Sequence, residues 1–389
     1  MAERILQIGV LGLSRGFVLM RPTFLADPRC RLAAAADPRT EARAAFQTEF
    51  DGPAYASAEE LCENPDVEIV YIASPHQWHV EQAVLAARHG KHVLVEKPMA
   101  LSLADCKAMR SAAEAAGVWL IVGPSHSYDA PIVRAAELIA SGEHGTLRMI
   151  TALNFTDFLY RPRRPEELDS AQGGGVVFSQ AAHQVDVVRR LAGAPIRSVR
   201  AQTGAWDPSR PTEGAYQAFL NFEGGATATL SYSGYGRYDT DALMDWVGET
   251  GGRKDPDDYG AARRRLASAD EDELKRLRAY GSQPQPDGPS MPLHEHFGFV
   301  VASCERADLR PTASGVEIYA EDARRTVELP PPAAPRAAVI DELWRAVVDG
   351  VPPLHDGAWG EANLAVCLAI LKSSAEGREV ALDELESAR

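Results

Sequence analysis

The sequence predicts an α/β protein with two sheets of different kinds. We expect a doubly wound parallel sheet in the N-terminal part and an α+β domain with an open, largely antiparallel sheet in the C-terminal part. Over residues 5–125, short apolar runs alternate with helical patterns, which is typical of parallel strands joined by crossover helices. After Gly145 the pattern changes to longer β-rich stretches, with one helical segment at 180–193 among them.

Five apolar runs define the strands expected in the N-terminal half, and they cover residues 5–12, 31–37, 67–74, 91–98 and 118–125. Each run ends at Gly, Pro, Asp or Ser, where a strand gives way to a loop. Between them, Ser57 and Glu60 have the spacing of a capping box at a helix start, and Gly90 is placed to end the helix over 81–90.

Three consecutive segments follow from these patterns. The parallel sheet and its helices occupy residues 1–125, and the α+β domain occupies residues 126–355. Within that domain, residues 237–290 are polar and rich in Gly and Pro, with a helix expected over 270–281. This insertion is interpreted either as a lid or oligomer contact or as a solvent-exposed segment without such a role. Residues 356–389 contain an amphipathic helix expected to pack back on the body.

Composition narrows the functional classes. The chain has 389 residues and a formal net charge of −15, which argues against a nucleic-acid partner because phosphate contacts need a basic surface. Its five cysteines are scattered, without a C-x-x-C pair, which favours a reducing cytoplasm and no structural zinc. The N-terminus resembles no secretory signal, and no apolar run reaches the ~18 residues of a membrane span, so we expect an unprocessed protein without a membrane partner.

The first strand opens into a glycine turn that suits a dinucleotide pyrophosphate, because glycine allows close approach of backbone amides. The match is imperfect, since serine and phenylalanine stand where the second and third glycines usually lie. Asp37 ends the second run at the spacing where a carboxylate accepts ribose hydroxyls, which favours NAD, while Arg39 leaves NADP open. The turn contributes Gly9, Gly12, Ser14, Arg15 and Gly16 as candidate cofactor-binding residues.

The fourth run ends in Glu96-Lys97-Pro98. In an open α/β sheet the ligand binds beyond the carboxyl ends of the strands, so the residues that end each strand are functional candidates. A Glu-Lys pair is usually a surface ion pair of little consequence. Here it follows a buried run, so we expect Lys97 to face the cofactor.

At this point the sequence resembles the Gfo/Idh/MocA oxidoreductases over nearly its whole length. The resemblance is carried by the glycine turn at 9–16, AADP at 35–38, IASPHQWHVEQAVLAARHGKHVLVEKP at 72–98, GGGVVFSQAAHQVD at 173–186 and the closing helix. It implies a Rossmann-type NAD(P) domain and a dehydrogenase that moves a hydride between nicotinamide and a small hydroxylated substrate. It also implies that Lys97 and His183 are catalytic, and that Ser74, Pro75 and His79, with Glu96, line the cofactor side.

One departure from the family concerns the helix that carries His183. The family's catalytic aspartate falls on Ser179, and a hydroxyl cannot replace a carboxylate as proton acceptor. His183 is therefore the candidate general base, since a neutral imidazole can take a hydroxyl proton. Lys97 would stabilise the alkoxide. Gln180 and Asp186, from the same segment, are candidates for substrate contact, and a structural role for Asp186 is favoured.

Arg161, Arg163 and Arg164 cluster between two prolines just before this segment. Guanidinium groups beside a catalytic element suggest capture of carboxylates, and the alternative is pairing with Glu166, Glu167 and Asp169 on a surface loop. The surrounding motif, NFTDFLYRPRRPEELD, together with HEHFGF at 294–299, resembles a branch of the family that converts phthalate 4,5-cis-dihydrodiol to 4,5-dihydroxyphthalate. That chemistry implies a carboxylated aromatic cis-dihydrodiol as substrate, with aromatisation supplying driving force.

Three histidines complete the candidates for the substrate site. His126 follows the fifth run, and His294 and His296 form an H-x-H pair. Two histidines without a third ligand are more often hydrogen-bonding residues than a metal site, so no metal is expected. Two other functions stay open, namely a sugar, inositol or glycoside dehydrogenase of the same family and a dinucleotide-binding regulator without turnover. As in the family, a homodimer or homotetramer through the C-terminal sheet is expected.

Overall fold

The computed structural model describes residues 4–282 and 293–387, so the end of the insertion, 283–290, lies outside the described residues. The chain divides into two compact units. The first comprises residues 1–124, 272–289 and 333–364, and the second comprises residues 125–271, 290–332 and 365–389. The expected division into three consecutive segments does not include this return of residues 272–289 and 333–364 to the first unit.

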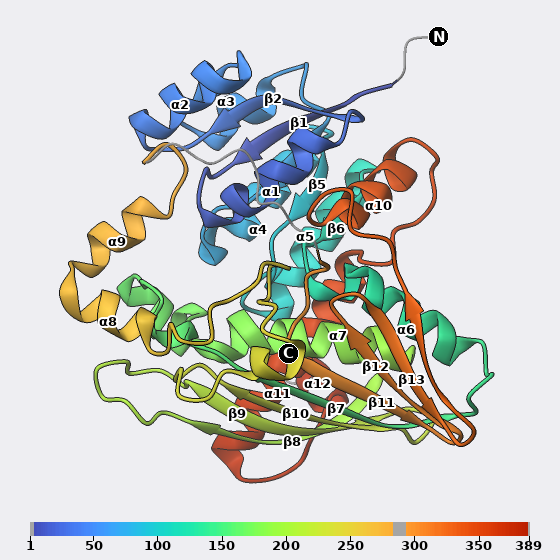
Figure 1. Ribbon diagram of the computed structural model, residues 1–389. Coiled ribbons are helices and arrows are strands. Elements are labelled where there is room, and N and C mark those ends of the chain that lie inside the picture. Colours follow the sequence, from blue (N-terminus) through green and yellow to red (C-terminus); the bar gives the residue numbers. More distant parts are fainter. Residues whose placement is uncertain (1–3, 283–292, 388–389) are drawn as a thin grey trace. The chain divides into compact units, whose positions relative to one another are not determined.

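The first unit contains a six-stranded parallel sheet in the order β3-β2-β1-β4-β5-β6 within the described residues (Figure 1). Strand order reverses between β1 and β4, which creates the crevice where doubly wound sheets bind ligands. The strands are β1 (Leu6–Leu11), β2 (Cys30–Ala36), β3 (Ala54–Tyr55), β4 (Ile69–Ile72), β5 (His92–Val95) and β6 (Leu120–Val122). All five expected runs contain a strand. The two-residue β3 was too short to give a periodic signal.

Helices of the first unit begin and end where the sequence places its capping residues. Ser57 accepts a hydrogen bond from the Glu60 amide, and Glu60 accepts one from the Ser57 amide, which confirms the capping box. Gly90 adopts a φ of 71° after the helix over the 81–90 segment. The helices are α1 (Arg15–Ala26), α2 (Thr40–Phe50), α3 (Ala58–Glu63), α4 (His79–Arg88), α5 (Leu103–Ala116) and α10 (Ala337–Val347).

The second unit contains a nine-stranded sheet in the order β14-β13-β12-β11-β7-β10-β9-β8-β15 among the described residues. Only β10 and β7 pair in parallel there, which confirms the largely antiparallel sheet. The strands are β7 (Leu147–Phe155), β8 (Ile196–Gly204), β9 (Ala215–Phe222), β10 (Thr227–Ser233), β11 (Phe299–Cys304), β12 (Ala307–Thr312), β13 (Gly315–Ala320), β14 (Arg324–Glu328) and β15 (Val380–Ala381).

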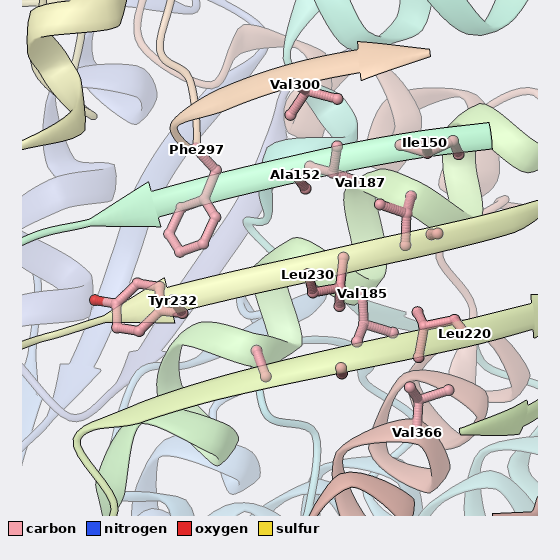
Figure 2. Packing of buried hydrophobic residues seen from close by; sticks show 14 of the residues in the cluster. Ile150, Ala152, Val185, Val187, Leu220, Leu230, Tyr232, Phe297, Val300 and Val366 are labelled. Carbon is pink, nitrogen blue, oxygen red and sulfur yellow. The ribbon is translucent and has the colours of Figure 1, made fainter. Parts of the chain in front are cut away.

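Helices cover one face of this sheet and form the core of the second unit with it. Figure 2 shows Val185 and Val187 of α7 beside Ile150, Leu220 and Leu230 of the strands, all within one buried cluster. The alternate side chains of the strands stay exposed on the other face, as at Met149, Phe219 and Tyr319. The helices are α6 (Ala130–Ala140), α7 (Ala182–Ala192), α8 (Ala261–Ser268) and α12 (Asp383–Ser387), while α9 (Glu271–Leu277) and α11 (Gly357–Glu376) cross between the units' residue ranges.

Two helices differ in length from the sequence-based expectation. The segment 180–193 forms α7 only from residue 182, because residues 177–181 form a π-helical turn, η6 (Val177–Ala181). Such insertions in helices are often associated with functional sites. The helix expected over 270–281 ends at Leu277, since the chain then turns to place Tyr280 against α1 of the first unit.

Candidate active site

The turn after β1 is packed tightly against the ends of two neighbouring strands. Gly12 has a φ of 88°, and a Cβ there would lie 2.8 Å from the Ser74 Cα, so only glycine fits. A Cβ at Gly16 would lie 3.1 Å from Glu96 Oε1. Ser14 is the N-cap residue of α1 and its hydroxyl donates to the Ala73 carbonyl. Exposed Arg15 begins α1, whose first amides suit a pyrophosphate.

Gly9 lies inside β1, below this turn. A Cβ there would come within 2.9 Å of Leu61 Cδ2 and Val67 Cγ1. Its glycine therefore allows close packing of the sheet against α3. Of the predicted cofactor-binding residues, Gly9 therefore lies in the β1 strand below the turn. Gly12, Ser14 and Gly16 lie in the turn itself.

Asp37 follows β2 and is buried beneath the same turn. Its Oδ2 accepts a hydrogen bond from the Leu13 amide at 2.8 Å. The Arg39 side chain donates to both of its carboxylate oxygens at 3.0 Å. The Asp37 carboxylate, which we expect to bind the ribose hydroxyls, is thus already hydrogen-bonded to the turn and to Arg39.

The residues after β4 and β5 are joined by a buried histidine. His79 is fully buried, with Nδ1 3.1 Å from the Pro98 carbonyl oxygen and Nε2 3.1 Å from that of Ser74. Burial lowers its pKa, which favours the neutral ring. Ser74 donates to Gln82 Oε1 at 2.7 Å, and Pro75 leads into the 3₁₀ turn η1 (His76–Trp78). His79 therefore fixes the turns that carry Ser74 and Lys97.

Lys97 stands between a carboxylate and a proline at the end of β5. Its peptide bond to Pro98 is cis. The neighbouring Glu96 accepts a hydrogen bond from Tyr71 Oη at 2.7 Å. Burial raises the pKa of Glu96 although the charge of Lys97 opposes that shift. The ammonium group is thus placed on the carboxyl edge of the sheet, where a doubly wound fold binds its ligand.

His183 lies on the first turn of α7, among aromatic side chains of the second unit. Its Nδ1 is 3.1 Å from Ser125 Oγ, and its ring centroid is 4.8 Å from both His126 and Phe297. Ser179 stands four residues earlier in the π-helical turn and is partly exposed. Gln180 from the same turn accepts a hydrogen bond from Tyr232 Oη at 3.1 Å. The π-helical turn thus places a hydroxyl where the family has its carboxylate.

His126 forms a buried pair with Asp129. Its Nδ1 lies 2.7 Å from Asp129 Oδ2. Burial alone would lower the His126 pKa, but the charge and hydrogen bond of Asp129 outweigh it, so the pKa is raised. The carboxylates of Glu295 and Glu249 add to this effect. This pair lies directly beside His183, with ring centroids of the two histidines 4.8 Å apart.

Replacing Asp129 with asparagine is expected to destabilise the protein more at pH 6 than at pH 9. A histidine with a raised pKa stabilises the fold fully below its unfolded pKa, and this contribution is lost as pH rises through the folded pKa. Chemical unfolding at both pH values measures the difference, with Glu137→Gln on α6 as an exposed control. Equal losses at the two pH values would refute the charged pair.

Asp186 supports the turn that carries His126. The side chain is 1 % exposed, and its Oδ2 accepts a hydrogen bond from the Ser127 amide at 3.1 Å. This contact ties α7 to the 3₁₀ turn η2 (His126–Tyr128). The geometry favours the structural role for Asp186 over substrate contact.

The three clustered arginines all have acidic or carbonyl partners. Arg161 donates to Asp157 at 2.8 Å and to Glu249 at 3.2 Å. Arg163 stacks on the Phe158 ring, 3.6 Å from its centroid, and donates to the Phe158 carbonyl. Both guanidinium groups lie within electrostatic range of Tyr232, which stacks with Phe297 beside His183.

Two of the arginines pair with carboxylates of the following loop, as the surface-loop alternative expected. Arg164 pairs with Glu166 at 2.7 Å and Glu167 at 3.7 Å, and Arg163 also pairs with Glu167 at 3.6 Å. Asp169 instead accepts a hydrogen bond from the Ala171 amide at 2.9 Å. Arg163 thus contacts both the Phe158 ring and a loop carboxylate, whereas Arg161 pairs with Asp157 and Glu249.

The H-x-H pair makes backbone contacts. His294 Nε2 lies 2.9 Å from the Pro330 carbonyl oxygen. His296 Nε2 lies 2.8 Å from that of Val247, and its Nδ1 accepts from the Gly298 amide at 3.0 Å. These bonds give both rings a structural role. Within residues 4–282 and 293–387, no group of three His, Cys, Asp or Glu side chains has the arrangement of a metal site.

Several residues near His183 were not predicted from the sequence. Ser125 and Asp129 flank His126 and could have been found from their position directly after the β6 strand end. Phe297 lies in the HEHFGF motif at 294–299, whose phenylalanine was given no role. Tyr232 and Glu249 come from segments far apart in the chain, and no local pattern distinguishes them.

Two family models match separate parts of the chain. Residues 4–124 match the oxidoreductase family with an NAD-binding Rossmann fold, and residues 132–253 match the GFO/IDH/MocA C-terminal domain. A 1-carboxy-3-chloro-3,4-dihydroxycyclohexa-1,5-diene dehydrogenase of Comamonas testosteroni is 46% identical over 94% of each chain. The chain belongs to the Gfo/Idh/MocA oxidoreductase family. As in other members, its Rossmann domain binds NAD.

Solved structures of other proteins share the architecture. A dehydrogenase-like protein from Bordetella bronchiseptica is 40% identical, with a TM-score of 0.92, covering 97% of this chain and 100% of that one. The WlbA dehydrogenase from Bordetella pertussis, solved with NADH and UDP-GlcNAcA, covers 97% and 99% with a TM-score of 0.68. At 21% identity it is evidence for the fold alone. No helix within the described residues is long and apolar enough to cross a membrane.

Proposed function

We propose that the protein oxidises one carbinol of a carboxylated cyclohexadiene diol with NAD as hydride acceptor, giving a ketone that tautomerises to a catechol. The observation that carries this proposal is the 46% identity, over 94% of both chains, to a dehydrogenase whose name specifies such a substrate. Phthalate 4,5-cis-dihydrodiol is the dicarboxylated member of this class. The Arg161 and Arg163 pair near Tyr232 supports a carboxylated ligand.

The chain's own residues supply binding and proton transfer. Gly12, Ser14 and Gly16 hold the pyrophosphate, as the packed turn after β1 leaves no room for side chains there. NAD held there would supply the acceptor for the hydride of the carbinol carbon. His183 takes the hydroxyl proton as the C=O bond forms, and Ser125 orients its ring through Nδ1. Lys97 stabilises the developing alkoxide.

The replacement of the family aspartate by Ser179 fits this substrate class. A serine cannot accept the proton as an anion, so His183 carries that step with His126 and Asp129 beside it. Aromatisation of the product lowers the demand for base strength. A sugar or inositol would supply no such driving force.

A substrate panel tests the proposal. Reduction of NAD and NADP is followed at 340 nm with a carboxylated dihydrodiol, a phthalate cis-dihydrodiol, neutral benzene cis-diols, inositols and pyranosides. Turnover on the carboxylated diols supports the proposal. Turnover restricted to sugars or inositols would support a dehydrogenase but contradict the proposed substrate class. NADH binding without turnover of any substrate would favour a regulator.

Replacing Arg161 with glutamine is expected to raise KM for a carboxylated diol by about tenfold and to change KM for a neutral diol little, since a charge-assisted hydrogen bond would be lost only with the former. Arg164→Gln is the matched control, because Arg164 pairs with Glu166 and Glu167. Steady-state kinetics on the two substrates measure the effect. Equal changes for both diols would show that Arg161 serves packing alone.

We also expect a homodimer or homotetramer through the uncovered face of the nine-stranded sheet. Met149, Phe219 and Tyr319 are each more than 40% exposed there. Exposed apolar side chains on one sheet face suit a subunit contact. Light scattering of the wild type and of Phe219→Glu measures the oligomeric state. An unchanged molecular mass of the variant assembly would show that this sheet face is not the subunit contact.

We also propose that the protein is located in the cytoplasm. None of the five cysteines, which all lie within the described residues, forms a disulfide, and burial raises the pKa of Cys62 to about 11 and that of Cys106 to about 12. Thiols held protonated resist oxidation, although they form no disulfide framework. Cell fractionation tests the location.

A further inference from the structure

Part of the polar insertion packs on the dinucleotide unit. Residues 272–282 belong to this unit although the sequence places them inside the second domain. We propose that residues 278–281, the clasp, hold Arg39 against Asp37 and thereby select against a dinucleotide with a 2′-phosphate. The inference rests on the NAD-binding function of the family and is independent of the substrate proposed above.

The clasp is anchored by one aromatic side chain. Tyr280 is 2% exposed, and its ring meets the Phe17 ring of α1 edge-on, with centroids 5.1 Å apart. Its hydroxyl donates to Glu49 Oε2 of α2 at 2.7 Å. Glu49 also accepts a hydrogen bond from Arg21 Nε at 2.6 Å. Tyr280 thus links the two helices that flank the cofactor turn, which an unattached surface loop would not do.

Gly281 brings the clasp close to the start of α2. Its φ is 81°, and a Cβ there would lie 2.8 Å from the Ala42 Cα and 3.1 Å from the Glu41 carbonyl oxygen. These are backbone atoms that cannot rotate away. A side chain at position 281 would therefore push the clasp off α2.

The backbone of the clasp reaches the cofactor turn itself. The Tyr280 amide donates to the Leu13 carbonyl at 3.3 Å. Arg39 donates to the Tyr280 carbonyl through Nη1 at 3.2 Å and to the Leu13 carbonyl through Nη2 at 2.7 Å. Two carbonyl groups, one from each side, therefore hold the guanidinium group.

Asp37 completes the arrangement. Arg39 Nε donates to Asp37 Oδ1 and Nη2 donates to Oδ2, each at 3.0 Å. Four of the five guanidinium N–H groups thus have acceptors in this arrangement. Recognition of a 2′-phosphate needs a two-pronged donor, and Arg39 can offer that only by leaving the clasp.

The negative charge of Asp37 also disfavours a dinucleotide with a 2′-phosphate. A 2′-phosphate at this strand end would meet the carboxylate of Asp37, whereas the ribose hydroxyl of NAD can donate to it. The clasp keeps Arg39 bound to that carboxylate. Arg43 also lies here, and its guanidinium group donates to the Asp37 and Pro38 carbonyls. Selection therefore comes from occupying Arg39, in addition to the presence of Asp37.

Binding of NADH and NADPH, measured by fluorescence titration of the purified protein, tests the clasp. We expect the wild type to prefer NADH, and Gly281→Ala to lower the ratio of the NADPH and NADH dissociation constants by about tenfold, because released Arg39 can bind the phosphate. Gly252→Ala, at an insertion glycine with open space around its Cβ, should leave the ratio unchanged.

Tyr280→Leu gives a second test should Gly281→Ala fail to fold. It removes the ring contact with Phe17 and the bond to Glu49 and should shift the ratio in the same direction. A purely structural role would weaken both ligands equally, so an unchanged ratio in a folded variant overturns the proposal. Failure of the wild type to bind either dinucleotide would instead contradict the family function.

Discussion

His183→Asn is expected to lower kcat for diol oxidation by ~10²–10⁴-fold, the usual contribution of a general base. Asparagine can keep a polar contact with Ser125 but cannot accept the carbinol proton. Since Ser179 offers no carboxylate in place of the family aspartate, no neighbouring residue of the π-helical turn takes over this step. The variant should bind NADH like the wild type.

Stopped-flow and steady-state rates across pH measure this prediction. The wild-type rate should fall at acidic pH as the base is protonated, and the variant should lose that dependence. The exposed His89 provides the control substitution, His89→Asn. A variant that retains near wild-type kcat and the acidic limb would mean that another group is the base.

Lys97→Met is expected to lower kcat/KM by ~10²–10³-fold, because removing one donor to a developing oxyanion costs about that much. Methionine preserves much of the side-chain volume at the end of β5, so the cis peptide turn and the Glu96–Tyr71 hydrogen bond have no reason to change. The effect should fall on kcat more than on NADH affinity.

Steady-state kinetics, together with dissociation constants for NADH, distinguish a loss of kcat from a loss of NADH affinity. Lys107→Met, at an exposed position on α5, is the matched control. If the loss appeared only in NADH affinity and kcat stayed unchanged, Lys97 would be a cofactor-binding residue without a part in the chemical step.

Local sequence patterns were sufficient for most of the elements that position the site. The capping box at Ser57 and Glu60 and the end of α4 before Gly90 depend on residues within one turn, so they could be predicted. The β3 strand could not, because two residues carry no periodicity. The helix predicted over 270–281 was too long, since the attachment of Tyr280 to Phe17 depends on a residue over 260 positions earlier.

The candidate residues divide along the same line. Lys97 and Asp37 could be chosen from the sequence because they directly follow apolar runs, and strand ends gather at one edge of a parallel sheet. Their partners could not be chosen in this way. Glu249, a partner of Arg161, lies 88 residues away from it, and the Tyr280 carbonyl, an acceptor for Arg39, lies 241 residues away.

The sequence by itself therefore determined the two kinds of sheet, the family, and the strand-end and helix residues that are candidates for chemistry. The distant partners of these residues came only from the tertiary structure, namely Glu249 for Arg161 and the Tyr280 carbonyl for Arg39. The physical reason is that periodicity and capping act over a few residues, whereas the pairing of a buried charge depends on segments brought together by packing of the core.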